Sequence, residues 1–220
     1  MKFKGFVHAV IAGHGGVDEH GEYQILKKGT KQANVDGTMI YEGEQNRHIR
    51  DRVMSQSSAM GLKVIDLVPE INDITLGERV RRINANYNQW EKQGYRLLVW
   101  ELHLNAFNGQ ASGTEIFTTR GNNFSDVMAK EWWDVKEKLV SDYKGRPDYS
   151  DGDPDKEADF YVIKNSKAYA TLIEFFFFDH PDSVKKFCNE NGWSLWAKTV
   201  VEAMKVIEEK YDPTTLKERV

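Results

Sequence analysis

The chain has 220 residues, 40% of them hydrophobic, and a formal net charge of -4. This length suits one domain with a sizeable core and is short for two. Basic residues are mixed with a slight excess of acidic ones, so no basic surface for phosphate backbones is expected, and nucleic acid is not an expected partner. No apolar run approaches the roughly 18 residues that cross a bilayer, which argues against membrane insertion.

The N-terminal segment and the cysteine content further limit the class of protein and the kinds of site that the chain can contain. Residues 1–16 contain two lysines and a short apolar run, but His8 interrupts that run and a glycine-rich turn follows it. We therefore interpret the segment as a first strand and not as a secretory signal. The single cysteine, Cys188, excludes an intrachain disulfide and any zinc site built from several cysteines.

Strand-like and helix-like segments alternate along the chain. Apolar runs predict strands at 6–13, 62–69, 95–104, 113–119 and 169–178. Apolar residues that recur every three or four positions predict helices after Gln45, from Leu76, from Phe124 and around Trp193. This alternation favours an α/β domain, with helices on both faces of a largely parallel sheet.

Two segments do not fit a periodic pattern. Residues 27–43 look like a connection punctuated by glycines, and residues 143–159 form a polar segment rich in proline and aspartate. A loop as long as the second is usually functional or mobile, so it could form a rim or a lid. The spacing of its aspartates does not match a calcium-loop pattern, so we interpret it as solvated.

Glu174 stands inside an apolar run, with Leu172 and Ile173 before it and four phenylalanines after it. Such a run reads as a fully buried strand. An unpaired charge there costs several kcal/mol even after relaxation, so this carboxylate needs an explanation.

Two histidines follow predicted strands in the same way. His14 lies in the glycine turn after the first strand, and His103 ends the strand at 95–104. Side chains at the carboxyl ends of strands can face a ligand crevice. Histidine nitrogens suit zinc, and a catalytic zinc site usually takes three protein ligands. Glu42 and Glu44, just before a predicted helix, both offer a third ligand, although either could simply complement the helix dipole.

A zinc site nearby would explain why a carboxylate, Glu174, stands in an apolar strand. A carboxylate in an apolar strand has a raised pKa, and beside a zinc-bound water it can act as general base and then as general acid. Such a set of residues hydrolyses amides. The structural alternative is a Glu174 that forms a salt bridge, for example to Lys164 or Arg120.

These residues resemble the zinc-dependent N-acetylmuramoyl-L-alanine amidases, whose catalytic domain is shared by cell-wall hydrolases and phage endolysins. The matching motifs, in chain order, are "GHGGVD" at 13–18, Glu42 seven residues before Ile49 with Asn46 between them, "HLNA" at 103–106 followed by "GTE" at 113–115, and "LIEFFFFDHPDSVKKF" at 172–187. The similarity runs from about residue 5 to about residue 210, and several motifs in the right order are far more specific than any one of them.

The resemblance implies both a fold and a site. It implies a single α/β domain with a twisted, mixed and largely parallel sheet of about six strands between helices. It implies that His14, Glu42 and His103 hold zinc and that Glu174 is the catalytic acid/base. We assign residues 1–212 to the amidase catalytic domain and residues 213–220 to a C-terminal tail.

The sequence departs from the family pattern around both histidines. Ile11-Ala12 replaces the usual Asp-Pro, Glu101 stands where a serine is common, and the glycine expected near His20 is displaced to Gly21. Strand alternation puts Glu101 on the same side as His103, where it could orient a ligand or compete as one. Asn105 and Glu115 are candidate substrate contacts, with ordinary turn and strand roles as alternatives.

The expected activity is zinc-dependent cleavage of the amide between N-acetylmuramic acid and L-alanine in peptidoglycan. Without a visible secretion signal or wall-binding module, we expect a monomeric phage endolysin that is made in the host cytoplasm and acts on the cell wall or periplasmic peptidoglycan. One alternative is a zinc peptidase that cuts stem or cross-bridge peptides. Another is a wall-binding module that keeps the fold without turnover.

Overall fold

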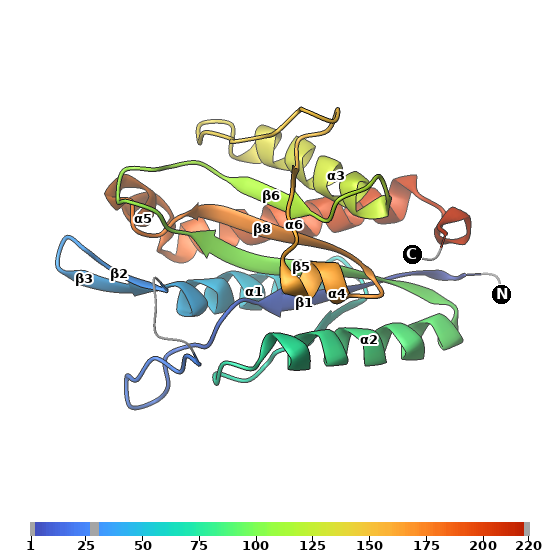
Figure 1. Ribbon diagram of the computed structural model, residues 1–220, viewed down its shortest axis with the longest axis horizontal. Helices are drawn as coiled ribbons and strands as arrows, with labels where there is room; N and C mark the ends of the chain where they lie inside the picture. Colours follow the sequence, from blue (N-terminus) through green and yellow to red (C-terminus); the bar gives the residue numbers. More distant parts are fainter. Residues whose placement is uncertain (1–2, 27–30, 218–220) are drawn as a thin grey trace.

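The computed structural model describes residues 3–26 and 31–217 (Figure 1). A six-stranded sheet in the order β4-β1-β5-β8-β6-β7 forms its centre. These strands are β1 (Gly5–Ala12), β4 (Val64–Asp66), β5 (Tyr95–Asn105), β6 (Glu115–Thr118), β7 (Lys156–Glu157) and β8 (Tyr169–Phe177). β4, β1, β5 and β8 are parallel, whereas β6 is antiparallel to β8. The predicted single α/β domain with a mixed, largely parallel sheet is confirmed.

Helices cover both faces of this sheet. They are α1 (Glu42–Ala59), α2 (Leu76–Gln93), α3 (Phe124–Leu139), α4 (Tyr161–Asn165), α5 (Pro181–Phe187) and α6 (Glu190–Lys210). One core joins α1, α3, α5 and α6 to one face, and a second core joins α2 and α4 to the other. No helix among the described residues is long and apolar enough to cross a bilayer.

Alternate residues of the central strand β5 face the two cores. Leu98, Trp100 and Leu102 enter the first core, and Leu97 and Val99 enter the second. Because both faces are covered, the strand is apolar at nearly every position. The polar side chains needed for chemistry are therefore confined to the carboxyl end of β5.

The glycine-punctuated segment contains a hairpin that we did not predict. β2 (Gln32–Val35) and β3 (Thr38–Tyr41) pair antiparallel around a turn in which Asp36 and Gly37 have φ of 50° and 85°. Two successive positive φ values match the tight hairpin turn that Asp-Gly favours. Residues 27–30 of the same segment lie outside the described residues.

The C-terminal residues that the structure describes pack against the domain. After a short 3-10 helix at Pro213–Thr215, Leu216 is buried and its carbonyl oxygen accepts a hydrogen bond from Arg96. The Tyr169 hydroxyl donates to the Lys217 carbonyl oxygen at 2.6 Å. The division into a domain at 1–212 and a tail at 213–220 stays a prediction.

The aromatic core beneath α6 predicts a large loss of stability when one of its buried side chains is shortened to alanine. Trp196 is fully buried, with its ring centroid 5.4 Å from Phe175 and 5.1 Å from Phe187. Trp196→Ala should lower the free energy of unfolding by about 3–5 kcal/mol because it leaves a cavity among these rings. Phe107→Ala, at a side chain that is 77% exposed, should change it little. Urea unfolding of both variants checks this, and equal losses would contradict the packing described here.

Candidate metal centre and catalytic carboxylate

The candidate site begins as a row of residues that crosses the parallel strands β1, β5 and β8 toward their carboxyl ends and continues to the first residue of the antiparallel strand β6. His103 of β5 is paired in register with Glu174 of β8, and Glu174 is paired with Glu115 of β6. Gly13 follows β1 and its backbone N–H donates to the Leu102 carbonyl oxygen, which puts it beside His103. Paired residues on neighbouring strands lie about 5 Å apart, so these groups form one continuous surface.

Gly13 is the point of closest approach in this row. A Cβ atom added there would lie 2.2 Å from Cε1 of His103 and 2.5 Å from both ring nitrogens. The His103 ring therefore occupies the space that any side chain at position 13 would need. This explains the glycine before His14 by a contact with the second histidine.

The turn that carries His14 is held in an uncommon conformation. His14 has a φ of 60°, in the left-handed region that non-glycine residues rarely adopt. Two buried arginines support it, since Arg47 of α1 donates to the His14 carbonyl oxygen at 2.8 Å and Arg79 of α2 donates to that of Ala12 at 2.8 Å. The side chain of Asn46 donates to the Gly13 carbonyl oxygen at 3.1 Å. Helices from both faces thus fix the direction of the His14 ring.

Glu42 is the first residue of α1 and is completely buried. One of its oxygens, Oε1, lies 3.3 Å from His14 Nε2 and 3.0 Å from His103 Nδ1. The backbone N–H of Leu104 donates to the same oxygen at 3.3 Å, and Lys31 Nζ lies 3.2 Å from Oε2. A carboxylate at a helix N-terminus is also stabilised by the helix dipole.

In the described part of the chain, these are the one set of three or more histidine, cysteine, aspartate or glutamate side chains whose ligand atoms converge closely enough to hold a metal ion. Ligand atoms of His14, Glu42 and His103 all lie within 4.8 Å of one another. Glu44 points elsewhere, because its Oε2 accepts the Val17 backbone N–H at 2.9 Å and its Oε1 faces His48 at 3.5 Å. The geometry thus distinguishes the two carboxylates between which the local sequence could not choose.

The protonation states of this group are strongly coupled. Burial opposes ionisation of Glu42, but the rings of His14 and His103 outweigh it and hold the pKa of Glu42 well below its usual value. Burial also opposes a charged His103, yet hydrogen bonds to Glu101 and Glu42 raise its pKa to about 10. Burial lowers the pKa of His14 despite the nearby Glu42. The metal-free group therefore holds an anionic Glu42, a cationic His103 and a neutral His14.

A bound metal ion would give the polar atoms of this group more partners than they have in its absence. His14 Nε2 is buried and has no hydrogen-bond partner among the described residues, and the buried Glu42 Oε2 has only the ion pair to Lys31. Such unsatisfied atoms are costly, and a bound cation would satisfy them. Two imidazoles and one carboxylate are a donor set typical of catalytic zinc, which leaves a position open for water.

Glu101 is the neighbour that the sequence places on the same side as His103. Its Oε1 lies 3.5 Å from His103 Nε2, on the opposite edge of the ring from Glu42. A carboxylate that binds the second nitrogen of a ligating histidine fixes its tautomer and orientation. The geometry therefore matches an orienting role for Glu101, because the His103 ring separates it from the His14 and Glu42 ligand atoms.

Glu174, unlike Glu42 and Glu101, has no histidine or lysine within ion-pair distance among the described residues. Its Oε2 is buried without a hydrogen bond, and burial raises its pKa to about 8, although the nearby His103 opposes that rise. The proposed salt bridge to Lys164 or Arg120 is not formed, because Lys164 binds Asp159 at 2.8 Å and both cations line a cavity away from this row. A carboxyl group with a pKa near neutrality suits proton transfer in both directions.

Glu115, the next carboxylate in the row, has the opposite environment. Its Oε1 accepts hydrogen bonds from Arg146 at 2.8 Å and Lys156 at 2.6 Å, and its Oε2 accepts one from Asn105 at 2.7 Å. Glu115 is thus charge-compensated, whereas Glu174 beside it is not. Sequence patterns named Asn105 and Glu115 but missed both cations, which lie in the segment interpreted as a solvated loop.

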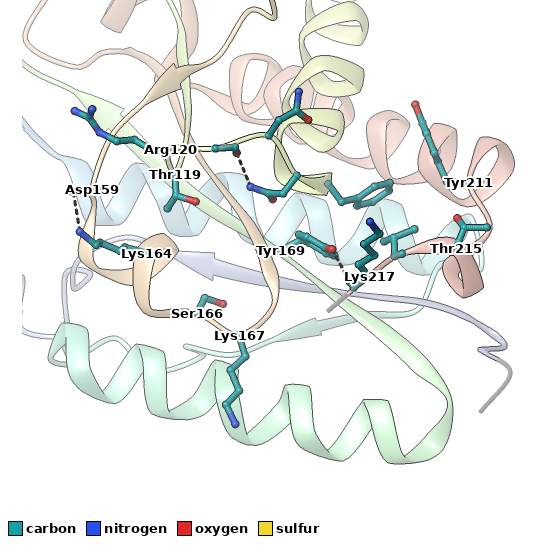
Figure 2. Close-up of a pocket in the computed structure, with 15 residues that line it drawn as sticks. Thr119, Arg120, Asp159, Lys164, Ser166, Lys167, Tyr169, Tyr211, Thr215 and Lys217 are labelled. Atoms are coloured by element: carbon teal, nitrogen blue, oxygen red, sulfur yellow. Dashed lines mark hydrogen bonds and ion pairs between the residues drawn. The ribbon is translucent and has the colours of Figure 1, made fainter. Parts of the chain in front are cut away.

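A large cavity lies elsewhere in the described part of the molecule. A cavity of about 1110 Å³ is lined by residues from the start of β8, the loop before α3, α4 and the C-terminal segment (Figure 2). Tyr169 and Lys164 belong to it, but no member of the His14, Glu42, His103 and Glu174 group does. The reactive groups therefore lie at the opposite end of β8 from this cavity.

Comparison with known proteins identifies the family. The sequence model of the family Amidase_3, described as N-acetylmuramoyl-L-alanine amidase, matches residues 9–206. The chain belongs to this amidase family. Its members' activity on peptidoglycan is therefore the activity class of this chain, and the family resemblance noted in the sequence is confirmed. No curated protein sequence matches the amidase.

Solved structures share the amidase fold. The N-acetylmuramoyl-L-alanine amidase from Clostridium difficile 630 superposes with a TM-score of 0.74 at 21% identity, covering 94% of this chain and 98% of that one. The catalytic domain of CwlV from Bacillus (Paenibacillus) polymyxa var. colistinus gives 0.71 at 17% identity, covering 94% and 99%. The catalytic domain of the CD27L endolysin, which targets Clostridia difficile, gives 0.66 at 25% identity, covering 91% and 97%.

The close approach of Gly13 to the His103 ring predicts that a side chain at position 13 weakens metal binding by the amidase. Gly13→Ala should displace the His103 ring and lower metal affinity at least tenfold, while the fold persists. Gly77→Ala is the matched control, because a Cβ there would meet nothing within 4 Å. Calorimetric zinc titration with circular dichroism measures both; unchanged zinc affinity in Gly13→Ala would contradict the geometry.

The raised pKa of Glu174 predicts a pH dependence of stability in the metal-free amidase. Ionisation of this partly buried carboxyl group disfavours the folded state. The folded wild type therefore loses stability as pH rises from 4.5, the ordinary pKa of a glutamate, to about 8, the raised pKa of Glu174. Glu174→Gln removes the penalty. Its stability relative to the wild type should therefore rise between pH 5 and pH 8 in urea unfolding, whereas a constant difference would show that the carboxyl ionises normally.

Proposed function

We propose that this amidase is zinc-dependent and cleaves the bond between the lactyl group of N-acetylmuramic acid and the L-alanine of the stem peptide. The observation that carries the proposal is the convergence of His14, Glu42 and His103 beside the unpartnered carboxyl group of Glu174. The family gives the reaction class, and this donor set gives the cofactor. Both are needed for the full assignment.

Each residue has a distinct task in this proposal. His14, Glu42 and His103 would hold zinc, with Glu101 orienting the His103 ring. Zinc, when bound, lowers the pKa of water to about 7 and polarises a carbonyl oxygen. The negative charge of Glu42 would partly neutralise the cation inside the buried site. Arg47 and Arg79 keep the His14 backbone in its strained turn.

Glu174 would move the proton. Its unpartnered Oε2 accepts a proton from the attacking water and then donates it to the leaving alanine nitrogen. A pKa raised by burial makes both transfers feasible near neutral pH. Glu115 cannot serve equally well, because Arg146, Lys156 and Asn105 already occupy its oxygens.

We also propose that the biological role is that of a phage endolysin, acting as a monomer on the cell wall. The similarity to the CD27L endolysin catalytic domain supports this role. The fold itself does not separate endolysins from other wall amidases, since both kinds occur among the structural relatives. The division of the chain into a catalytic domain at residues 1–212 and a C-terminal tail at residues 213–220 is also part of this proposal.

The role of each residue predicts a split between metal binding and turnover. Glu174→Gln should keep one zinc per chain and lose activity by about 10²–10⁴-fold, because only proton transfer is removed. His103→Ala should lose both zinc and activity. Glu209→Gln, an exposed glutamate on α6, is the matched control and should change neither. Loss of zinc in Glu174→Gln would mean that Glu174 is a ligand.

The reaction itself is tested on purified peptidoglycan. The proposal predicts new N-terminal alanine amines with intact cross-links in the digest. Cut cross-bridges with no free alanine would identify a peptidase instead. Binding to sacculi with neither zinc nor amine release would identify a non-catalytic wall-binding module.

A further inference from the structure

A second group of carboxylates lies away from the proposed zinc site. Asp153 and Asp155 precede β7, Asp126 lies in the first turn of α3, and Glu157 is in β7. Burial is the main cause that raises the pKa values of Asp126 and Asp155, and the Asp153 carboxyl group adds to the rise in both, so the acids are close in space although they come from separate elements. The Thr118 hydroxyl at the end of β6 donates to Asp155 Oδ2 at 2.5 Å.

This group lacks a compensating positive charge. In the described part of the chain, none of these four carboxylates forms an ion pair. The nearby cations bind elsewhere: Arg146 and Lys156 bind Glu115, and Lys164 binds Asp159. The outer acids instead have backbone donors, since Asp126 accepts the Asn123 N–H and Glu157 accepts the Gly121 N–H at 2.9 Å.

Asp153 and Asp155 are the two acids of this group that have buried oxygens without a hydrogen-bond partner. Asp155 is only 2% exposed, and its Oδ1 is buried with no hydrogen-bond partner. Asp153 Oδ1 is also buried and unpartnered. Burial, and then the Asp153 carboxyl group, raise the pKa of Asp155 to about 8. A buried carboxyl pair of this kind must either share a proton or bind a cation at neutral pH.

We propose that Asp153 and Asp155 form a calcium site that fastens the segment between α3 and β7 to the end of β6. The available donors are oxygens only, which suits a hard cation and not zinc. Ca²⁺ takes six to eight oxygen ligands in flexible geometry, so backbone carbonyls and water can complete a site with two carboxylates from a loop. Asp126 and Glu157 add negative charge around it.

The site has a consequence for the rest of the molecule. The same segment carries Arg146 and Lys156, whose hydrogen bonds hold Glu115 in register beside Glu174. Neutralising Asp153 and Asp155 would therefore stabilise the loop that supports this part of the proposed active site. The calcium site itself does not depend on the proposed function, because none of its residues belongs to the zinc group.

Calcium titration of the zinc-loaded protein tests the proposal. Isothermal calorimetry should show one Ca²⁺ per chain, and the melting temperature should rise with calcium, since a ligand at 100 times its Kd shifts the folding equilibrium about 100-fold. Asp155→Asn and Asp153→Asn should each abolish both responses. Asp36→Asn, the same change in the exposed turn between β2 and β3, should keep them.

The calcium-free behaviour of the variants adds a second readout. Asp155→Asn replaces a carboxyl group whose ionisation burial disfavours, with little change of shape, so in calcium-free buffer it should melt no lower than the wild type. Should that variant fail to fold, Asp153→Asn, whose side chain is only partly buried, carries the same test. The proposal is overturned if the wild type takes up no calcium at millimolar concentration, or if both variants bind it as tightly as the wild type.

Discussion

The site depends on how one completely buried carboxylate is stabilised. Glu42 lies at the start of α1, and its charge is stabilised by two imidazoles, the Lys31 ammonium group and the backbone N–H of Leu104 in β5. An unpaired charge at that depth would cost several kcal/mol, so the elements that carry these partners must converge on it. The carboxyl ends of β1 and β5 and the start of α1 are thereby brought to one place.

Close backbone contacts make this convergence possible. A side chain at Gly43 would come within 1.8 Å of the Gly15 carbonyl oxygen, and one at Gly13 would overlap the His103 ring. The glycines of the first turn thus serve packing between segments as much as turn geometry. Because these contacts are tight, the positions of both imidazoles are set by the backbone before any metal arrives, which is the preorganisation that metal sites require.

Carboxylates that lie near one another acquire different properties from their surroundings. Glu42 is held ionised by the histidines, Glu115 is neutralised by Arg146 and Lys156, and Glu174 is left unpartnered with a raised pKa. Environments that separate the pKa values of neighbouring acids are how enzymes divide the roles of ligand, support and proton carrier. The row His103–Glu174–Glu115 shows this division along adjacent strands.

The sequence predicts the parts of this structure that local patterns determine. Apolar runs located the main strands, and the position of His14 and His103 just after two of them already indicated a shared edge. The β2–β3 hairpin was missed although Asp36-Gly37 is a strong turn signal, because its short strands lack an apolar alternation. Arg146, Lys156 and the burial of Asp155 could not be predicted, since each depends on a contact with a strand about 30 or more residues away. The choice of Glu42 over Glu44 needed either the family spacing or the fold.

The central claim is that His14, Glu42 and His103 share one zinc ion. An anomalous difference map, recorded at the zinc absorption edge from crystals of the zinc-loaded protein, tests it most directly. We expect a single strong peak bounded by the two imidazoles and the Glu42 carboxylate. A peak at another group of side chains, or two imidazoles turned apart with no peak between them, would contradict it.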